Sequence, residues 1–277
     1  MTHPFDFLRR LGLAAAGALT LATLPAAPVP AAGTEVVTLT VRGGAKQRFL
    51  IVRPEGPPKA AVVLYSGSNG NLKIGADGSI ENAGNFLVRS REHFAAEGFL
   101  VAVVDRPSDW AGSDKDRYRV VAAHAEDAAA IARRLRQEAG GDRPVWFIGT
   151  SRGTISVANI ASRLGGNAVG GIVLTSAVTS PGKRGQLAVP DVDVAGVAAP
   201  VLILGHGGDD CYVTQWPEQE ALAKLFKGAA SVETFRVDGG DAGNHADPCG
   251  PYSHHGFLGQ EKAVVGRIAT WIRGHLK

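Results

Sequence analysis

The sequence predicts an α/β fold class, with a mostly parallel sheet of eight strands that carries helices on both faces. First, short apolar runs alternate with longer segments of helical periodicity from residue 60 onward, which is typical of successive β-α units. Second, runs such as 60–65 and 99–104 are apolar throughout, as expected for parallel strands buried on both faces. Third, the apolar run 144–148 leads into Gly-x-Ser-x-Gly, and a helical pattern follows at once.

Two β-rich runs, 36–41 and 48–53, precede this alternation. They are separated by Gly43 and Gly44, which predicts an antiparallel hairpin. The other strands are expected at 60–65, 99–104, 144–148, 171–175, 201–204 and 232–237. The helices are expected at 86–97, 118–139, 155–161, 218–226 and 261–275. Because no repeat or low-complexity linker divides residues 34–277, we expect them to form a single domain.

Residues 1–33 have the pattern of a secretory signal peptide that is removed from the mature chain. Arg9 and Arg10 precede the apolar run 11–24, and residues 25–32 are mostly small. The apolar run is too short to span a bilayer comfortably, so no membrane span is expected in the mature chain, and an uncut anchor is the alternative reading. We therefore expect a periplasmic or secreted protein, exported by the general secretory or the twin-arginine route.

The charge pattern and the motif content exclude several classes of function. The formal net charge is only +3, and no block of like charge stands out, so neither nucleic acid nor an anionic membrane surface is an expected partner. No Gly-x-Gly-x-x-Gly follows the first parallel strand, and no metal-ligand spacing is present. We therefore expect no cofactor and no metal. The sequence carries no signal for the oligomeric state.

The chain has two cysteines, Cys211 and Cys249. In an exported protein an even pair favours a disulfide, and two cysteines without nearby histidine ligands make a poor zinc site. Closing a loop of this length stabilises a fold by up to about 4 kcal/mol in the chain-entropy model.

Ser151 lies at the centre of the Gly-x-Ser-x-Gly motif, between a strand and a helix. Gly149 and Gly153 flank it at two residues on either side, so the backbone can turn sharply without Cβ clashes. The turn raises the hydroxyl above the strand ends and places it at a helix N-terminus, where negative charge is favoured. Ser151 is therefore the candidate nucleophile.

Candidate partners of this serine follow two later strands, because ligands of an open α/β sheet bind at the carboxyl ends of its strands. Asp209 and Asp210 come after strand 201–204. A carboxylate here can hold a histidine in the tautomer that catalysis needs. The segment after the last strand contains three candidate bases, which are His245, His254 and His255.

Over about residues 36–275 the chain resembles the α/β-hydrolases, in particular dienelactone-hydrolase-like esterases with little or no cap domain. The resemblance rests on residues 149–153 in their strand-turn-helix setting, on eight strands, and on the order Ser, Asp, His along the chain. It implies an exported serine hydrolase that cleaves a carboxylic ester through an acyl-enzyme. The alternatives are a peptidase or acyltransferase with the same triad, or an inactive binding protein.

The same resemblance selects among the candidate partners. Residues 206–214 align with the family pattern His-Gly-x-x-Asp-x-x-Val-Pro, which makes Asp210 the acid and Asp209 the alternative, with Thr214 in place of proline. The sequence His-Gly-Phe at 255–257 matches the usual setting of the base, so His255 is expected in that role, with His245 and then His254 as alternatives.

The remaining expectations concern the oxyanion hole, the disulfide and the substrate. The resemblance implies that the backbone N–H groups of Arg152 and Ser68 form the hole, although Ser66-Gly67 replaces the family's His-Gly. A disulfide between the two cysteines would fix the acid loop to the histidine loop. The stretch 176–199 is short for a cap, so we expect an open site for a small-molecule, bulky or polymeric ester.

Overall fold

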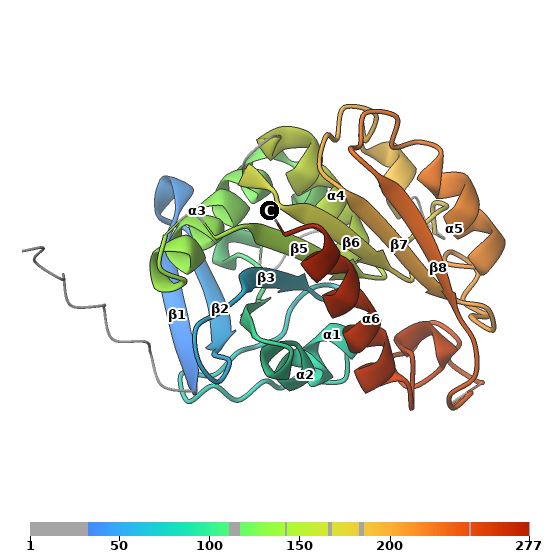
Figure 1. Cartoon of the computed structure of the whole chain (residues 1–277), viewed down its shortest axis with the longest axis horizontal. Helices are drawn as coiled ribbons and strands as arrows, with labels where there is room; N and C mark the ends of the chain where they lie inside the picture. Colours follow the sequence, from blue (N-terminus) through green and yellow to red (C-terminus); the bar gives the residue numbers. More distant parts are fainter. Residues whose placement is uncertain are drawn as a thin grey trace, which may run out of the picture.

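The computed structural model describes residues 33–110, 117–141, 143–165, 168–182, 186–243 and 245–276. These residues form one central sheet with helices on both of its faces (Figure 1). Except for Gly33, the expected leader 1–33 lies outside the described residues.

The sheet has eight strands in the order β1-β2-β4-β3-β5-β6-β7-β8. β1 pairs antiparallel with β2 and β2 antiparallel with β4, whereas every other pair is parallel. The predicted fold class and the predicted hairpin are therefore confirmed. The strands are β1 Thr34–Thr40, β2 Lys46–Val52, β3 Ala60–Tyr65, β4 Phe99–Val104, β5 Val145–Thr150, β6 Gly171–Thr175, β7 Val201–His206 and β8 Val232–Val237.

Six α-helices are present in the described part of the chain. They are α1 Phe86–Arg89, α2 Arg91–Ala96, α3 Ala122–Glu138, α4 Gly153–Leu164, α5 Trp216–Ala223 and α6 Glu261–Gly274. The helix expected at 86–97 is split at Ser90, which is buried and ends α1 where α2 begins. Residues Arg117–Val120 form a 3-10 turn, so α3 starts later than expected. None of the described helices is both long and apolar enough to cross a membrane.

The core consists of two layers, one on each face of the sheet. Successive strand residues point to opposite faces, so Val63 and Phe147 pack on the side of α3, α4 and α5, whereas Val62 and Trp146 pack on the side of α1, α2 and α6. All six positions of β3, β4 and β5 are buried, which explains their continuous apolar sequences.

The carboxyl ends of β3, β5 and β7 lie near one another because these strands are parallel in one sheet. Each of them leads directly into a loop with candidate functional residues: Ser66–Asn71 after β3, Ser151 after β5 and Asp209 after β7. The topology therefore places these candidate residues at one edge of the sheet, although they are separated by up to about 140 positions in the sequence.

Candidate active site

Ser151 occupies the apex of the turn between β5 and α4 in a strained backbone conformation. Its φ of 52° lies in the left-handed region, which is uncommon for a residue with a Cβ. Both flanking glycines are required sterically: a Cβ on Gly153 would overlap the carbonyl oxygen of Tyr65, and a Cβ on Gly149 would lie 2.5 Å from the carbonyl carbon of Gly153. The sharp strand-turn-helix geometry predicted for this motif is therefore present, and strain of this kind is concentrated at functional sites.

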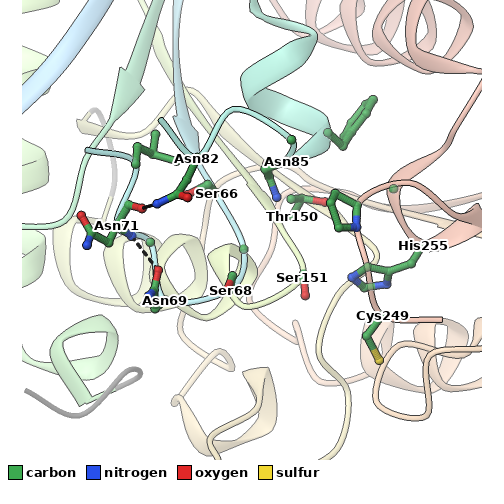
Figure 2. Close-up of a pocket in the computed structure, with 17 residues that line it drawn as sticks. Ser66, Ser68, Asn69, Asn71, Asn82, Asn85, Thr150, Ser151, Cys249 and His255 are labelled. Carbon is green, nitrogen blue, oxygen red and sulfur yellow. Dashed lines mark hydrogen bonds between the residues drawn. The ribbon is translucent and has the colours of Figure 1, made fainter. Parts of the chain in front are cut away.

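Backbone contacts hold this turn in place. The Ser151 N–H donates to the carbonyl oxygen of Thr175 at 3.0 Å, and the hydroxyl of Thr154 donates to the Ser151 carbonyl at 2.6 Å. These bonds use the main chain of Ser151 and leave its side chain directed into the adjoining pocket (Figure 2).

His255 lines the same pocket as Ser151, although 104 residues separate them in the sequence. In Figure 2 a ring nitrogen of His255 is directed toward the Ser151 hydroxyl. The backbone of His255 is fixed on both sides, because its N–H donates to the Ser253 hydroxyl at 3.2 Å and its carbonyl accepts from the Ser176 hydroxyl at 2.9 Å. The imidazole itself is buried, with 5% of the side chain exposed.

Asp209, and not Asp210, pairs with this histidine. Nδ1 of His255 lies 3.1 Å from Oδ2 of Asp209, whose side chain is fully buried. Asp210 is exposed and turned toward a small depression that His245 also lines. The expectation that Asp210 pairs with His255 is thus wrong, and the alternative, Asp209, makes this contact. The Asp209 N–H donates to the His206 carbonyl at 3.1 Å, so the chain turns directly after β7, and Asp209 is the buried one of the two aspartates.

Both oxygens of the Asp209 carboxylate are hydrogen-bonded. Oδ1 accepts from the Cys211 N–H at 2.9 Å, and Oδ2 accepts from the Thr214 hydroxyl at 2.7 Å. The Thr214 hydroxyl also lies 3.1 Å from His255 Nδ1, so it contacts both Asp209 and His255. Sequence reasoning treated Thr214 only as a substitute for proline; that departure from the family pattern was the one signal of its role.

A buried glutamine supports the acid loop from α5. The Gln219 amide donates to the Thr214 carbonyl at 2.8 Å and to the Ala177 carbonyl at 2.8 Å, and it accepts from the Ala177 N–H at 3.1 Å. It therefore connects the loop after β7 with the loop after β6.

The other two candidate histidines do not line the Ser151 pocket. The ring of His254 stacks on His206 with centroids 4.2 Å apart, and its Nδ1 lies 2.9 Å from the Gly208 carbonyl oxygen. His245 is exposed at the outer side of the same loop. Burial lowers the pKa of His206 below its usual value.

Cys211 and Cys249 form the expected disulfide, with a Cα–Cα distance of 4.6 Å. It joins the loop after β7, which carries Asp209, to the loop that leads to His255. Cys249 itself lines the pocket. Asp209, Cys211 and His255 have candidate ligand atoms within 4.8 Å of one another. While the disulfide is intact, however, the Cys211 sulfur is not a thiolate and the three groups are not a set of metal ligands.

The loop after β3 passes directly over Ser151. A Cβ on Gly67 would lie 2.9 Å from the Cβ of Ser151 and 3.1 Å from the Thr150 carbonyl oxygen, so only glycine fits at this crossing. The next residue, Ser68, has a φ of 51°. Both oxyanion-hole residues named from the sequence, Ser68 and Arg152, therefore lie beside Ser151 at the pocket wall.

Arg119 fixes the loop after β3 through hydrogen bonds to its backbone. Its guanidinium is buried and donates to the carbonyl oxygens of Ser66 and Ser68 at 3.3 and 3.2 Å, and to the Ser156 hydroxyl at 2.8 Å. No sequence pattern singles out this arginine, because its contacts join the 3-10 turn before α3 to segments far away in the chain.

Two adjoining depressions meet at Ser151. One has a volume of about 320 Å³ and extends toward α1, and the other, of about 380 Å³, extends toward the acid loop and the stretch 176–199. They share Ser68, Ser151, Cys249 and Pro251. The described residues of 176–199 include one 3-10 turn, Val189–Asp191, and no α-helix. Most of the loop 182–185 in this stretch lies outside the described residues.

Neither a known family nor a curated protein matches the sequence. Solved structures do match. A cold-adapted esterase from an Arctic intertidal metagenomic library is 16% identical, with a TM-score of 0.60 over 88% of this chain and 94% of that chain. An esterase from Pyrococcus furiosus is 12% identical, with a TM-score of 0.61 over 88% and 93%.

Dipeptidyl peptidase 4 from Porphyromonas gingivalis is 16% identical, with a TM-score of 0.55 over 89% of this chain and 36% of that larger chain. At such identities the likeness concerns the fold. Together with the eight-stranded sheet and the serine turn after β5, these matches identify the chain as having the α/β-hydrolase fold.

Proposed function

We propose that this protein is a serine hydrolase that cleaves carboxylic esters. The observation that carries the proposal is Ser151 in a left-handed turn with the buried Asp209–His255 pair in the same pocket. Serine, histidine and aspartate in this arrangement form a nucleophile, a general base and a group that orients the base.

In the first half of the reaction Ser151 Oγ bonds to the ester carbonyl carbon while His255 Nε2 takes the serine proton. The tetrahedral intermediate then breaks its C–O bond to the alcohol, and His255 returns the proton to the departing oxygen. Asp209 keeps Nδ1 protonated, so that Nε2 is free to accept a proton. In the second half water attacks the acyl-serine by the same route and releases the acid.

The charge on the tetrahedral oxygen requires two preorganised donors. We assign this role to the backbone N–H groups of Arg152 and Ser68, as the resemblance implies. The crossing of Gly67 above Ser151 and the anchoring of the loop by Arg119 support the assignment. Removal of one such donor typically costs about 10²–10³ in kcat.

The same groups would serve a peptidase or an acyltransferase. Two of the three similar structures described above are esterases, which favours an ester as the substrate, whereas one is a dipeptidyl peptidase. The inactive alternative is disfavoured because all the residue types of the triad are present. Export of the protein is part of the proposal, and the disulfide supports it because disulfides persist in oxidising compartments.

A fluorophosphonate probe with mass-spectrometric mapping of the adduct tests this function on the folded, disulfide-bonded protein. We expect labelling at Ser151 and turnover of p-nitrophenyl acetate, both abolished by Ser151→Ala and reduced at least 10³-fold by His255→Ala. His245→Ala serves as the matched control and should behave like the parent. Folded protein that neither reacts with the probe nor turns over the ester would exclude a serine hydrolase.

A further inference from the structure

The chemistry at His255 decides which of the two depressions receives the alcohol part of an ester. His255 must hand a proton to the departing alcohol oxygen, so the alcohol has to lie within reach of its imidazole. His255 lines the depression toward α1 and is not among the described residues that line the other one. The alcohol therefore occupies the depression toward α1, which we call the alcohol pocket, and the acyl group occupies the other.

Uncharged polar side chains make up much of the wall of the alcohol pocket. Four of its residues are asparagines, namely Asn69, Asn71, Asn82 and Asn85 (Figure 2). Among the described residues that line it there is no lysine, arginine, aspartate or glutamate. The acyl side differs, because Arg152 and Asp247 line it. The alcohol pocket thus offers hydrogen bonds without a net charge.

In three of these asparagines one polar atom of the side-chain amide is hydrogen-bonded to the backbone, and the other polar atom is available to a ligand. Asn69 Oδ1 accepts from the Asn71 N–H at 3.0 Å, Asn82 Nδ2 donates to the Asn71 carbonyl at 2.8 Å, and Asn85 Oδ1 caps α1 through the Leu87 N–H at 3.1 Å. Among the described residues, no partner is found for the donors Nδ2 of Asn69 and Asn85 or for the acceptor Oδ1 of Asn82. Preorganised groups bind at a lower entropic cost.

Asn85 lies close to Ser151. A Cβ placed on Gly67 would lie 2.9 Å from the Cβ of Ser151. The same point is 3.4 Å from Nδ2 of Asn85, so both side chains border Gly67. In Figure 2 the amide nitrogen of Asn85 is directed to the side of the pocket where Ser151 lies. A hydroxyl close to the esterified oxygen of the alcohol can therefore accept from this amide.

An exposed aromatic ring, that of Tyr252, lies at the rim of the alcohol pocket. Tyr252 is 54% exposed. Its hydroxyl lies beside Gly84, which lines the pocket: a Cβ placed on Gly84 would be 3.1 Å from the hydroxyl oxygen. The guanidinium of Arg89 covers part of the ring at 5.5 Å. The exposed remainder can pack on the C–H face of a saturated ring.

We propose that the alcohol pocket binds a polyhydroxylated alcohol, such as a sugar unit, so that the preferred substrate is an O-acylated carbohydrate. Hydroxyl groups both donate and accept, and they match the fixed mixture of amide donors and acceptors without needing a charge. This inference rests on the proposed ester hydrolysis. The bonds that form and break are the same: Ser151 takes the acyl group, and the sugar hydroxyl leaves with the proton from His255.

The test compares two acetate esters that share the acyl group and differ in the hydroxyls of the alcohol ring: a mono-O-acetylated methyl glucoside and cyclohexyl acetate. We expect kcat/KM for the glucoside ester to be at least about tenfold higher, which corresponds to one to three hydrogen bonds of ordinary net strength. Equal values, or a preference for the cyclohexyl ester, would overturn the inference.

The double variant Asn69→Ser/Asn85→Ser removes two amide donors, adds no charge and keeps an oxygen for each local bond, since serine is also a good N-cap. It should lower kcat/KM for the glucoside ester about tenfold and leave that for cyclohexyl acetate within about twofold. Gln137→Ser, which removes an exposed amide on α3, is the matched control and should change neither value.

Equal losses on both esters in the double variant would mean that the asparagines support the site generally and do not select the alcohol, which would refute the inference while ester hydrolysis itself stands. If the parent hydrolyses neither these esters nor p-nitrophenyl acetate, and the probe leaves Ser151 unlabelled, the proposed function itself is wrong, and the inference is refuted with it.

Discussion

The Thr214 hydroxyl lies 2.7 Å from Oδ2 of Asp209, the same oxygen that is 3.1 Å from His255 Nδ1. Because Thr214 is fully buried and its carbonyl is held by Gln219, this contact fixes the carboxylate and the imidazole relative to each other. The arrangement distinguishes Asp209 from its neighbour Asp210, which shares its chemistry and lies in solvent.

Asp209→Asn should lower kcat by about 10³–10⁴, because an amide cannot hold the histidine in the required tautomer. Asp210→Asn is the matched control one residue away, and it should keep kcat within about twofold of the parent because the side chain is exposed. Steady-state kinetics on p-nitrophenyl acetate measure both. A large loss in the Asp210 variant with a small one in the Asp209 variant would reverse our assignment.

Thr214→Val should lower kcat about 10- to 100-fold at nearly constant KM, because a hydrogen bond to the charged carboxylate is lost while the side chain stays branched at Cβ. Thr214→Ser restores the hydroxyl and should recover most of the activity. A positioning role also predicts that the pH profile of kcat moves in the valine variant and not in the serine variant. If both variants lose activity equally and the profile stays in place, packing explains the effect.

Gly67→Ala should reduce kcat by about 10²-fold or more, because its Cβ would meet the Ser151 Cβ at 2.9 Å and displace the nucleophile or the loop above it. Gly196→Ala is a suitable control, since a Cβ there contacts nothing within 4 Å. Kinetics together with thermal melting separate the two: the Gly196 variant should retain activity with an unchanged or slightly raised Tm. An active Gly67 variant would contradict the close crossing of the two segments.

His124 should make the protein sensitive to acid. Burial lowers the pKa of His124 to about 3, with Arg119 and Arg42 adding to the shift, and its ring lies edge-on between Tyr65 and Tyr118 at 5.4 and 5.1 Å. The unfolded chain binds a proton below about pH 6.5, so this contribution to stability is complete above that pH. It declines as the pH falls toward 3, by about 2 kcal/mol at pH 5.

The phenylalanine variant tests this sign. His124→Phe keeps an aromatic ring in the same packing but cannot be protonated, so the drop in unfolding free energy between pH 7.5 and pH 5 should be smaller by about 2 kcal/mol than in the parent. Urea denaturation at the two pH values measures it. An equal drop in both proteins would show that other groups cause the acid sensitivity.

Removal of the disulfide should reduce both stability and turnover. Cys211→Ser/Cys249→Ser should lower the free energy of unfolding by up to about 4 kcal/mol. Because the Cys211 N–H bonds to Asp209 and Cys249 lines the pocket, we expect kcat to fall as well at temperatures where the variant is folded. If the Tm falls while kcat at low temperature is unchanged, the bridge serves stability alone.

The sequence by itself determined the sheet, the hairpin and the serine turn, because these are marked by local periodicity and by glycines at fixed spacings in the chain. The continuous apolar runs of β3, β4 and β5 predicted parallel strands, and the Gly149 and Gly153 spacing predicted the turn at Ser151. It also narrowed the candidate partners of Ser151 to two aspartates and three histidines, because each group lies in the segment between the carboxyl end of a strand and the next α-helix.

Only the tertiary structure decided among these candidates. Asp209 and Asp210 are identical in chemistry and adjacent in sequence, so burial and the exact point at which the chain turns after β7 select the one that meets His255. Thr214, Gln219 and Arg119 act through contacts with residues 5 to 53 positions away, which leave no periodic signal in the chain. Which polar groups converge at a site is set by packing between loops, and packing is a property of the folded chain.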